Sequence, residues 1–157
     1  MESKLGQGSS FFVYLPKHQG QELAPATQED DASHGTGRIL FVDDQEMVLK
    51  AVSTMIKELG YEIASTTDPE NLLKIFLDDP GRFDLVIADY DMPQMTGLEL
   101  SQKILSISPG TPVILISGSA SPDIQIRARE AGVKEVVNKP LMVADIAEKI
   151  KKVLRAR

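Results

Sequence analysis

From Arg38 onward, short apolar runs alternate with amphipathic stretches, and this alternation restricts the fold more than any other feature. Runs of four or five apolar residues fit strands that are buried on both faces. The sequence predicts strands at 39–42, 61–64, 85–88, 113–116 and 133–137, and a predicted helix follows each. Such an order predicts a parallel sheet with helices on both faces.

Turn and cap residues indicate where these helices begin and end. Asp68-Pro69 and Ser121-Pro122 pair a capping side chain with a proline suited to the first helical turn. Glycine typically ends a helix, and Gly60 closes the first predicted helix while Gly132 ends the one that Ser121-Pro122 opens. Three of the five predicted helices therefore have a sequence signal at one end or at both.

Polar residues follow all five predicted strands, and only the second, which ends in the uncharged Ser65-Thr66-Thr67, contributes no candidate group. In doubly wound sheets, functional groups gather at the carboxyl ends of the strands. The groups in question are Asp43-Asp44, Asp89, Ser117 and Asn138-Lys139-Pro140. A single acid after a strand is explained by capping of the next helix, but capping does not explain the whole set at one edge.

Clustered carboxylates repel one another, and a bound cation relieves the repulsion. Oxygen ligands favour Mg²⁺ over zinc, and the chain has no cysteine for a thiolate site. A carboxylate such as Asp89 can attack a phosphoryl group, while Lys139 and Ser117 bind its oxygens. The predicted chemistry is formation of an aspartyl phosphate.

Residues 38–157 resemble a response-regulator receiver domain over their whole length. The matching stretches are 39–44, 84–93, 113–118 and 136–140. The resemblance implies a flavodoxin-like (βα)5 doubly wound parallel sheet with strand order 2-1-3-4-5. It also implies two-component phosphorelay signalling, in which Asp89 takes a phosphoryl group from a phosphohistidine on a histidine-kinase or phosphotransfer domain.

The resemblance assigns the site residues as well. Asp89, Ser117 and Lys139 would be catalytic, in phosphorylation of the domain itself and in slow loss of the group. Mg²⁺ would be held by Asp89, by Asp44 directly, by Asp43 mainly through water and by the Asp91 backbone carbonyl. Val136 departs from the pattern, because receivers usually carry a switch aromatic at this place.

The amino-terminal part has a separate resemblance. Residues 6–16 resemble the closing strand of a histidine-kinase ATP-binding domain, so residues 1–16 are interpreted as its remnant. The apolar run 11–15 predicts a single strand, and residues 17–37 predict a flexible linker. The resemblance implies that the parent protein is a hybrid histidine kinase. The present chain would lie in the cytoplasm, whether or not the parent protein is anchored in a membrane.

Two other functions would use part of the same residue set. Asp89-Tyr90-Asp91 fits the Asp-x-Asp nucleophile of haloacid-dehalogenase-like phosphatases, although that reading leaves Asp43-Asp44 unexplained. A scaffold that is never phosphorylated would not need the complete residue set. The net charge of −6 argues against nucleic-acid binding, no apolar run predicts membrane contact, and the oligomeric state is not indicated.

Overall fold

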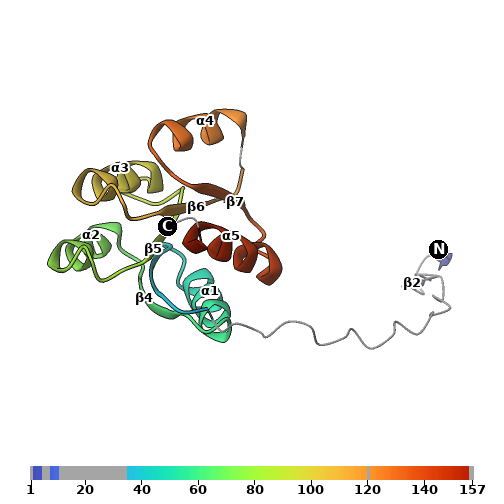
Figure 1. Cartoon of the computed structure of the whole chain (residues 1–157). Coiled ribbons are helices and arrows are strands. Elements are labelled where there is room, and N and C mark those ends of the chain that lie inside the picture. Colours follow the sequence, from blue (N-terminus) through green and yellow to red (C-terminus); the bar gives the residue numbers. More distant parts are fainter. Residues whose placement is uncertain (1, 5–7, 11–34, 120, 156–157) are drawn as a thin grey trace. The chain divides into compact units, whose positions relative to one another are not determined.

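The computed structural model describes residues 2–4, 8–10, 35–119 and 121–155 (Figure 1). The chain divides into two units, Met1–Ser33 and His34–Arg157. In the first unit, β1 (Glu2–Lys4) pairs antiparallel with β2 (Gly8–Ser10), and Ser3 lies opposite Ser9. The strand predicted at 11–15 and most of the predicted linker lie outside the described residues.

The second unit contains a five-stranded parallel sheet and five helices. The strands are β3 (Arg38–Val42), β4 (Glu62–Thr66), β5 (Leu85–Asp89), β6 (Val113–Ser117) and β7 (Glu135–Asn138). The helices are α1 (Glu46–Glu58), α2 (Pro69–Asp78), α3 (Gly97–Ile107), α4 (Pro122–Glu130) and α5 (Val143–Arg155). The order β4-β3-β5-β6-β7 confirms the predicted flavodoxin-like order 2-1-3-4-5.

Two apolar clusters hold the helices on opposite faces of the sheet. One joins α2, α3 and α4 through side chains such as Phe76, Ile104 and Ala128. The other joins α1 and α5, with Ile56 and Ile150 fully buried. Figure 1 shows the same division of the helices between the two faces. β5 and β6 are buried along their whole length, because they lie inside the sheet with helices on both sides.

The predicted caps are present. The Asp68 side chain accepts a hydrogen bond from the Glu70 N–H at 2.8 Å, and Pro69 opens α2. Gly60 and Gly132 adopt positive φ angles of 93° and 87°, which lets the chain leave α1 and α4. Among the described residues no helix is both long and apolar enough to span a bilayer.

The folded unit begins earlier than the boundary predicted after residue 37. The Gly35 N–H donates to the Leu59 carbonyl at 2.9 Å, and the Glu62 N–H donates to the Gly37 carbonyl at 3.0 Å. Residues 35–37 are therefore bonded to the turn after α1 and to the start of β4, although the sequence prediction placed them in the linker.

Candidate functional site

The carboxyl ends of β3 and β5 bring two acidic side chains together. Val42 lies opposite Ala88 in the parallel pairing of β3 with β5. The next residues, Asp43 and Asp89, therefore lie side by side at the carboxyl ends of these strands. Asp43 is fully buried and Asp89 is 2% exposed. Buried carboxylates are stable only when they are hydrogen-bonded or paired with a cation, so this edge needs a positive partner.

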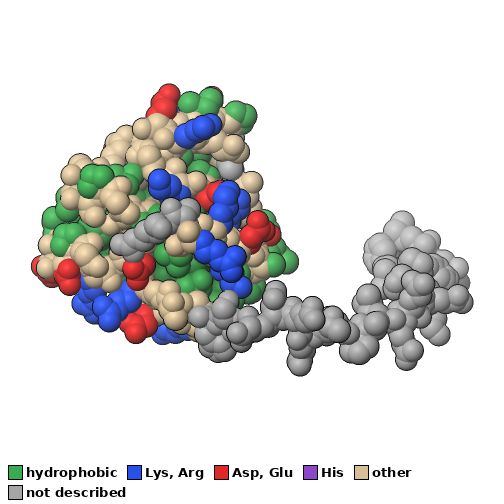
Figure 2. Space-filling view, viewed as in Figure 1, with side chains coloured by type: hydrophobic (Ala, Val, Ile, Leu, Met, Phe, Trp, Pro, Cys, Tyr) green, Lys and Arg blue, Asp and Glu red, His purple; other side chains and the backbone are tan. Residues whose placement is uncertain are grey.

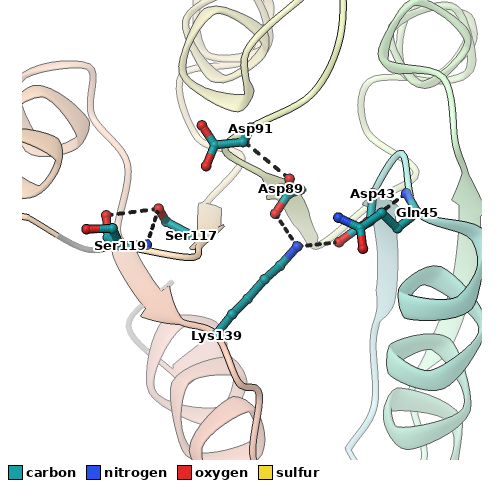
Figure 3. A network of polar contacts seen from close by, with 7 residues as sticks. All are labelled: Asp43, Gln45, Asp89, Asp91, Ser117, Ser119 and Lys139. Carbon is teal, nitrogen blue, oxygen red and sulfur yellow. Dashed lines mark hydrogen bonds and ion pairs between the residues drawn. The ribbon is translucent and has the colours of Figure 1, made fainter.

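Lys139, which follows β7, supplies that partner. Its Nζ lies 2.7 Å from Asp89 Oδ1 and 3.0 Å from Asp43 Oδ2, and Figure 3 shows the side chain reaching between the two. The remaining oxygens accept backbone hydrogen bonds. Asp89 Oδ2 accepts from the Asp91 N–H at 3.2 Å, and Asp43 Oδ1 accepts from the Gln45 N–H at 2.9 Å. Every oxygen of these two carboxylates thus has a partner.

Asp44 differs from its two neighbours. Its Oδ1 is buried and has no hydrogen-bond partner. A buried carboxylate oxygen without a partner is unfavourable, and a cation would satisfy it. The oxygen donors of Asp43, Asp44 and Asp89 therefore suit a hard cation such as Mg²⁺.

The carboxylates of Asp43, Asp44 and Asp89 are not arranged as a ready-made metal site. No group of three acidic or histidine side chains in the described part of the chain has the arrangement of a metal site. The physical reason lies in Lys139, because its ammonium group holds Asp43 and Asp89 around itself. A cation bound at these carboxylates would share their oxygens with Lys139.

Burial and charge shift the pKa values of the central pair. Burial raises the pKa of Asp89, and the charges of Asp43 and Asp44 add to this, while the ion pair with Lys139 opposes it. Burial by itself would lower the pKa of Lys139, but its bonds to Asp89 and Asp43 outweigh burial and raise that pKa. Lys139 therefore keeps its proton, and its charge favours the ionised form of Asp89.

Two predicted site residues reach this edge without joining the carboxylate network through their side chains. Ser117 is fully buried, but its hydroxyl donates to the Ser119 carbonyl at 3.0 Å and accepts from the Ser119 N–H at 3.2 Å. Figure 3 shows this hydroxyl turned away from Asp89. The Asp91 carboxylate also points away, and only its backbone N–H contacts Asp89.

Gly97 is a residue of the site that the sequence analysis missed. A Cβ atom at this position would lie 2.2 Å from the Asp89 carbonyl oxygen and 2.9 Å from Leu115 Cδ2. The Gly97 N–H also donates to the Tyr90 carbonyl at 3.0 Å. The start of α3 therefore packs directly against the backbone that carries Asp89. A glycine just after the capping residue Thr96 was the available signal.

Comparison with known proteins gives a consistent result. Residues 39–151 match the family model of the response regulator receiver domain. The aerobic respiration control sensor protein ArcB of Escherichia coli is 29% identical over 154 residues, which cover 96% of this chain and 19% of that protein. The two-component response regulator ARR12 of Arabidopsis thaliana is 28% identical over 120 residues, or 76% of this chain. The chain spans about a fifth of the length of either relative.

Solved structures share the fold. A response regulator receiver domain protein from Clostridium thermocellum superimposes with a TM-score of 0.72 at 27% identity, covering 76% of this chain and 94% of that one. The response regulator TrrA of Thermotoga maritima, solved in complex with Mg²⁺-BeF, gives 0.67 at 32% identity, covering 74% and 97%. The carboxylate edge described above thus lies in a fold that these proteins share.

Proposed function

The chain belongs to the response regulator receiver domain family of two-component signalling, and from this premise we propose that Asp89 accepts a phosphoryl group from a phosphohistidine. The observation that carries the proposal is the bridge of Lys139 between buried Asp89 and Asp43, beside the unpartnered Asp44 oxygen. The comparisons give no support to the phosphatase alternative based on Asp89-x-Asp91.

Asp89 has the features that a nucleophile at this place needs. The Lys139 charge favours its carboxylate form, and the Asp91 N–H fixes one oxygen. One Asp89 oxygen would form a bond to phosphorus as the P–N bond of the donor breaks, and the freed imidazole takes up a proton. Lys139 would then exchange its contact with Asp89 for a phosphoryl oxygen, keeping its charge beside the new negative group.

The cation-binding residues would be Asp43, Asp44 and Asp89, with the Asp91 carbonyl as a further ligand. Mg²⁺, when bound there, would neutralise charge on the carboxylates and on the transferred group. Ser117 could bind a phosphoryl oxygen only after its hydroxyl leaves Ser119, so its role requires a local rotation. We assign Ser117 to the reaction on this condition.

We also propose that this chain is part of a hybrid histidine kinase. The similarity to ArcB, which is named a sensor protein, covers 96% of the chain and so reaches into residues 1–16. This agrees with the resemblance of residues 1–16 to a kinase ATP-binding domain, followed by a linker and the receiver. The phosphohistidine would come from that kinase or from a phosphotransfer domain, in the cytoplasm.

Intact mass measurement tests the phosphoacceptor. The chain is incubated with Mg²⁺ and acetyl phosphate, and we expect the mass of one phosphoryl group, removable by hydroxylamine as for an acyl phosphate. Asp89→Asn should remove the gain. Asp44→Asn should weaken Mg²⁺ binding and with it the labelling, whereas Lys139→Met should slow labelling although Mg²⁺ still binds.

Asp91→Asn is the matched control, because it keeps the backbone N–H and carbonyl while removing a carboxylate that points away from Asp89. We expect this variant to be labelled at least as fast as the unaltered chain. A hydroxylamine-stable phosphate that persists in Asp89→Asn would overturn both the site and the mechanism.

A further inference from the structure

A small hollow lies at the amino-terminal end of the sheet, opposite the edge that carries Asp89. Its volume is about 250 Å³, and its walls come from the loop between α3 and β6, from residues 134–135 at the start of β7 and from the last turn of α5. β6 and β7 begin here, whereas Asp89 stands where β5 ends. Since the strands are parallel, a molecule in this hollow would lie a full strand length away from Asp89.

The loop that forms one wall of the hollow is held in place by its own hydrogen bonds. Pro109 and Pro112 line the hollow with their rings, which also restrict the backbone. Between them, the Thr111 N–H donates to the Ser108 carbonyl at 3.1 Å, and the Thr111 hydroxyl donates to the Ser108 hydroxyl at 2.9 Å. The Pro112 carbonyl accepts from the Val86 N–H at 3.0 Å, which ties the loop to β5. The wall is therefore preformed, so a ligand does not have to order it.

The rim of the hollow is positively charged, although the net charge of the chain is −6. Glu135 lines the hollow, but its carboxylate already bonds to both Lys149 and Lys152. Lys134 lies on the same rim, is exposed, and forms no ion pair with any residue that the structure describes. Figure 2 shows Lys and Arg side chains gathered over α5 and beside it. The rim therefore has a free ammonium group for an anion.

We propose that this hollow binds a small carboxylate with an apolar body, of roughly ten non-hydrogen atoms. The apolar body would lie against Pro109, Pro112 and Val153, and the carboxylate would pair with Lys134. A prearranged apolar wall with a few polar groups at its rim is typical of sites for small molecules. The ligand would occupy its site whether or not Asp89 is phosphorylated.

The size and the charge of the hollow select this class of ligand. A volume of about 250 Å³ corresponds to roughly eight water molecules, at about 30 Å³ each. This is below the range of about 300–1,000 Å³ found for drug-sized ligands, and it is too small for a folded segment of another protein. A phosphate group would bring a second negative charge beside Glu135, so a singly charged carboxylate fits the one free ammonium group of Lys134 better.

Titration of the full chain, followed by ¹H–¹⁵N NMR, tests the proposal. The probes are hexanoate and phenylacetate, with hexanamide as a neutral comparison and hexylamine as a cationic one. We expect saturable shifts of the Gly110, Lys134 and Val153 amide signals by at least one of the two acids, with a Kd in the millimolar range, as ligands of this size allow. Hexanamide should bind about threefold more weakly than hexanoate, and hexylamine more weakly still.

Two variants locate the binding. Gly110 lines the hollow, its φ is not positive, and a Cβ there meets no atom within 4 Å. Gly110→Leu should therefore fill open space without strain and weaken binding of the acids by about tenfold. Lys134→Gln should weaken the acids by about threefold and leave hexanamide unchanged. Gly81→Leu is the matched control, because a Cβ at Gly81, between α2 and β5, meets only Asp79 Oδ1 at 3.7 Å.

Thermal unfolding gives an independent measurement. The acids should raise the melting temperature of the unaltered chain and of Gly81→Leu, but not that of Gly110→Leu. Lys134→Gln, at an exposed position, keeps the test decisive if leucine at residue 110 disturbs the loop. The proposal is overturned if neither acid saturates, if hexylamine binds as tightly as hexanoate, or if neither Gly110→Leu nor Lys134→Gln weakens binding. Tighter binding of inorganic phosphate than of either acid at the same amide signals would assign another ligand and also overturn it.

Discussion

Asp89 shows how a buried carboxylate is kept in a folded domain at the expense of stability. Its carboxylate is buried beside Asp43 and Asp44, and one ammonium group, that of Lys139, serves two of these acids. Burial of charge with incomplete compensation is unfavourable. The ionised Asp89 side chain is therefore expected to lower the stability of the fold.

Asp89→Asn should accordingly raise the free energy of unfolding at neutral pH, by about 1 to 2 kcal/mol, because it removes one buried charge. The direction in which the unfolding free energy changes with pH follows from the raised pKa of Asp89. The folded chain binds this proton more tightly than the unfolded chain, so ionisation of Asp89 lowers stability as pH rises above its ordinary value of 3.8. Urea unfolding should show that the variant is more stable than the unaltered chain at pH 7. The difference in unfolding free energy should be smaller near pH 4. An equal advantage at both would contradict the argument.

Gly97 packs against the backbone of Asp89 at the same site. Gly97→Ala would place a methyl group against the Asp89 carbonyl, so α3 or the end of β5 must move. We expect a loss of about 2 kcal/mol or more in unfolding free energy, and slower labelling of Asp89 by acetyl phosphate. Gly118→Ala is the control, since a Cβ there meets no atom within 4 Å. Similar behaviour of the two variants would show that the close approach at Gly97 is unimportant.

At the residue scale, sequence could predict the groups whose position follows from strand order. Asp43, Asp89 and Lys139 each follow a strand, and parallel strands end at the same edge. It could not predict the direction of the Ser117 hydroxyl, because a hydrogen bond within its own loop sets it. Nor could it predict the contact of Gly97 with Asp89, which depends on how closely α3 packs on β5.

At the element scale, every predicted strand and helix of the second unit is present, but some ends differ. The strand predicted at 61–64 runs from Glu62 to Thr66, because the Tyr61 N–H is taken by the Ile56 carbonyl in the turn after α1. The strand predicted at 133–137 begins at Glu135, since the Val133 N–H bonds back to Ala128 at the end of α4. Apolar pattern locates the elements, whereas local hydrogen bonds determine their ends.

The ion pairs between β7 and α5 give a pH-dependent contribution at this scale. Burial opposes ionisation of Glu135, but bonds to Lys152 and Lys149 outweigh it and lower its pKa. The ionised Glu135 therefore stabilises the folded chain at pH values above its ordinary pKa of 4.5. This stabilisation is lost as the pH falls through the lower pKa of the folded state. Glu135→Gln should reduce the unfolding free energy by about 1 kcal/mol at pH 7 and by less below pH 4.

Glu62→Gln is the matched control for this prediction. Glu62 pairs with Arg38 at 3.0 Å, but the two side chains are 76% and 55% exposed. Exposed pairs contribute little, so this variant should change stability by less than about 0.5 kcal/mol at either pH. A larger loss from Glu62→Gln than from Glu135→Gln would contradict the distinction between half-buried and exposed pairs.

At the scale of the whole molecule, the start of the folded unit is held by contacts on the β3–β4 side. Gly35 lies so close to Tyr61 that a Cβ at this position would fall 1.9 Å from the ring carbon Cζ. Tyr61 is itself 6% exposed, and burial raises its pKa above 10.0 although Arg155 opposes this. Residues 35–37 thus cover an aromatic ring and add hydrogen bonds to Leu59 and Glu62.

Two truncations test whether residues 35–37 contribute to the stability of the folded unit. Deletion of residues 1–33 removes none of these contacts, and we expect unfolding free energy within about 0.5 kcal/mol of the full chain. Deletion of residues 1–37 removes two backbone hydrogen bonds and uncovers the Tyr61 ring, so it should lose about 2 kcal/mol. Spectrophotometric titration should also show the pKa of Tyr61 falling toward 10.0 in the shorter chain only. If both truncations match the full chain in stability and in the titration, residues 35–37 do not contribute to the fold.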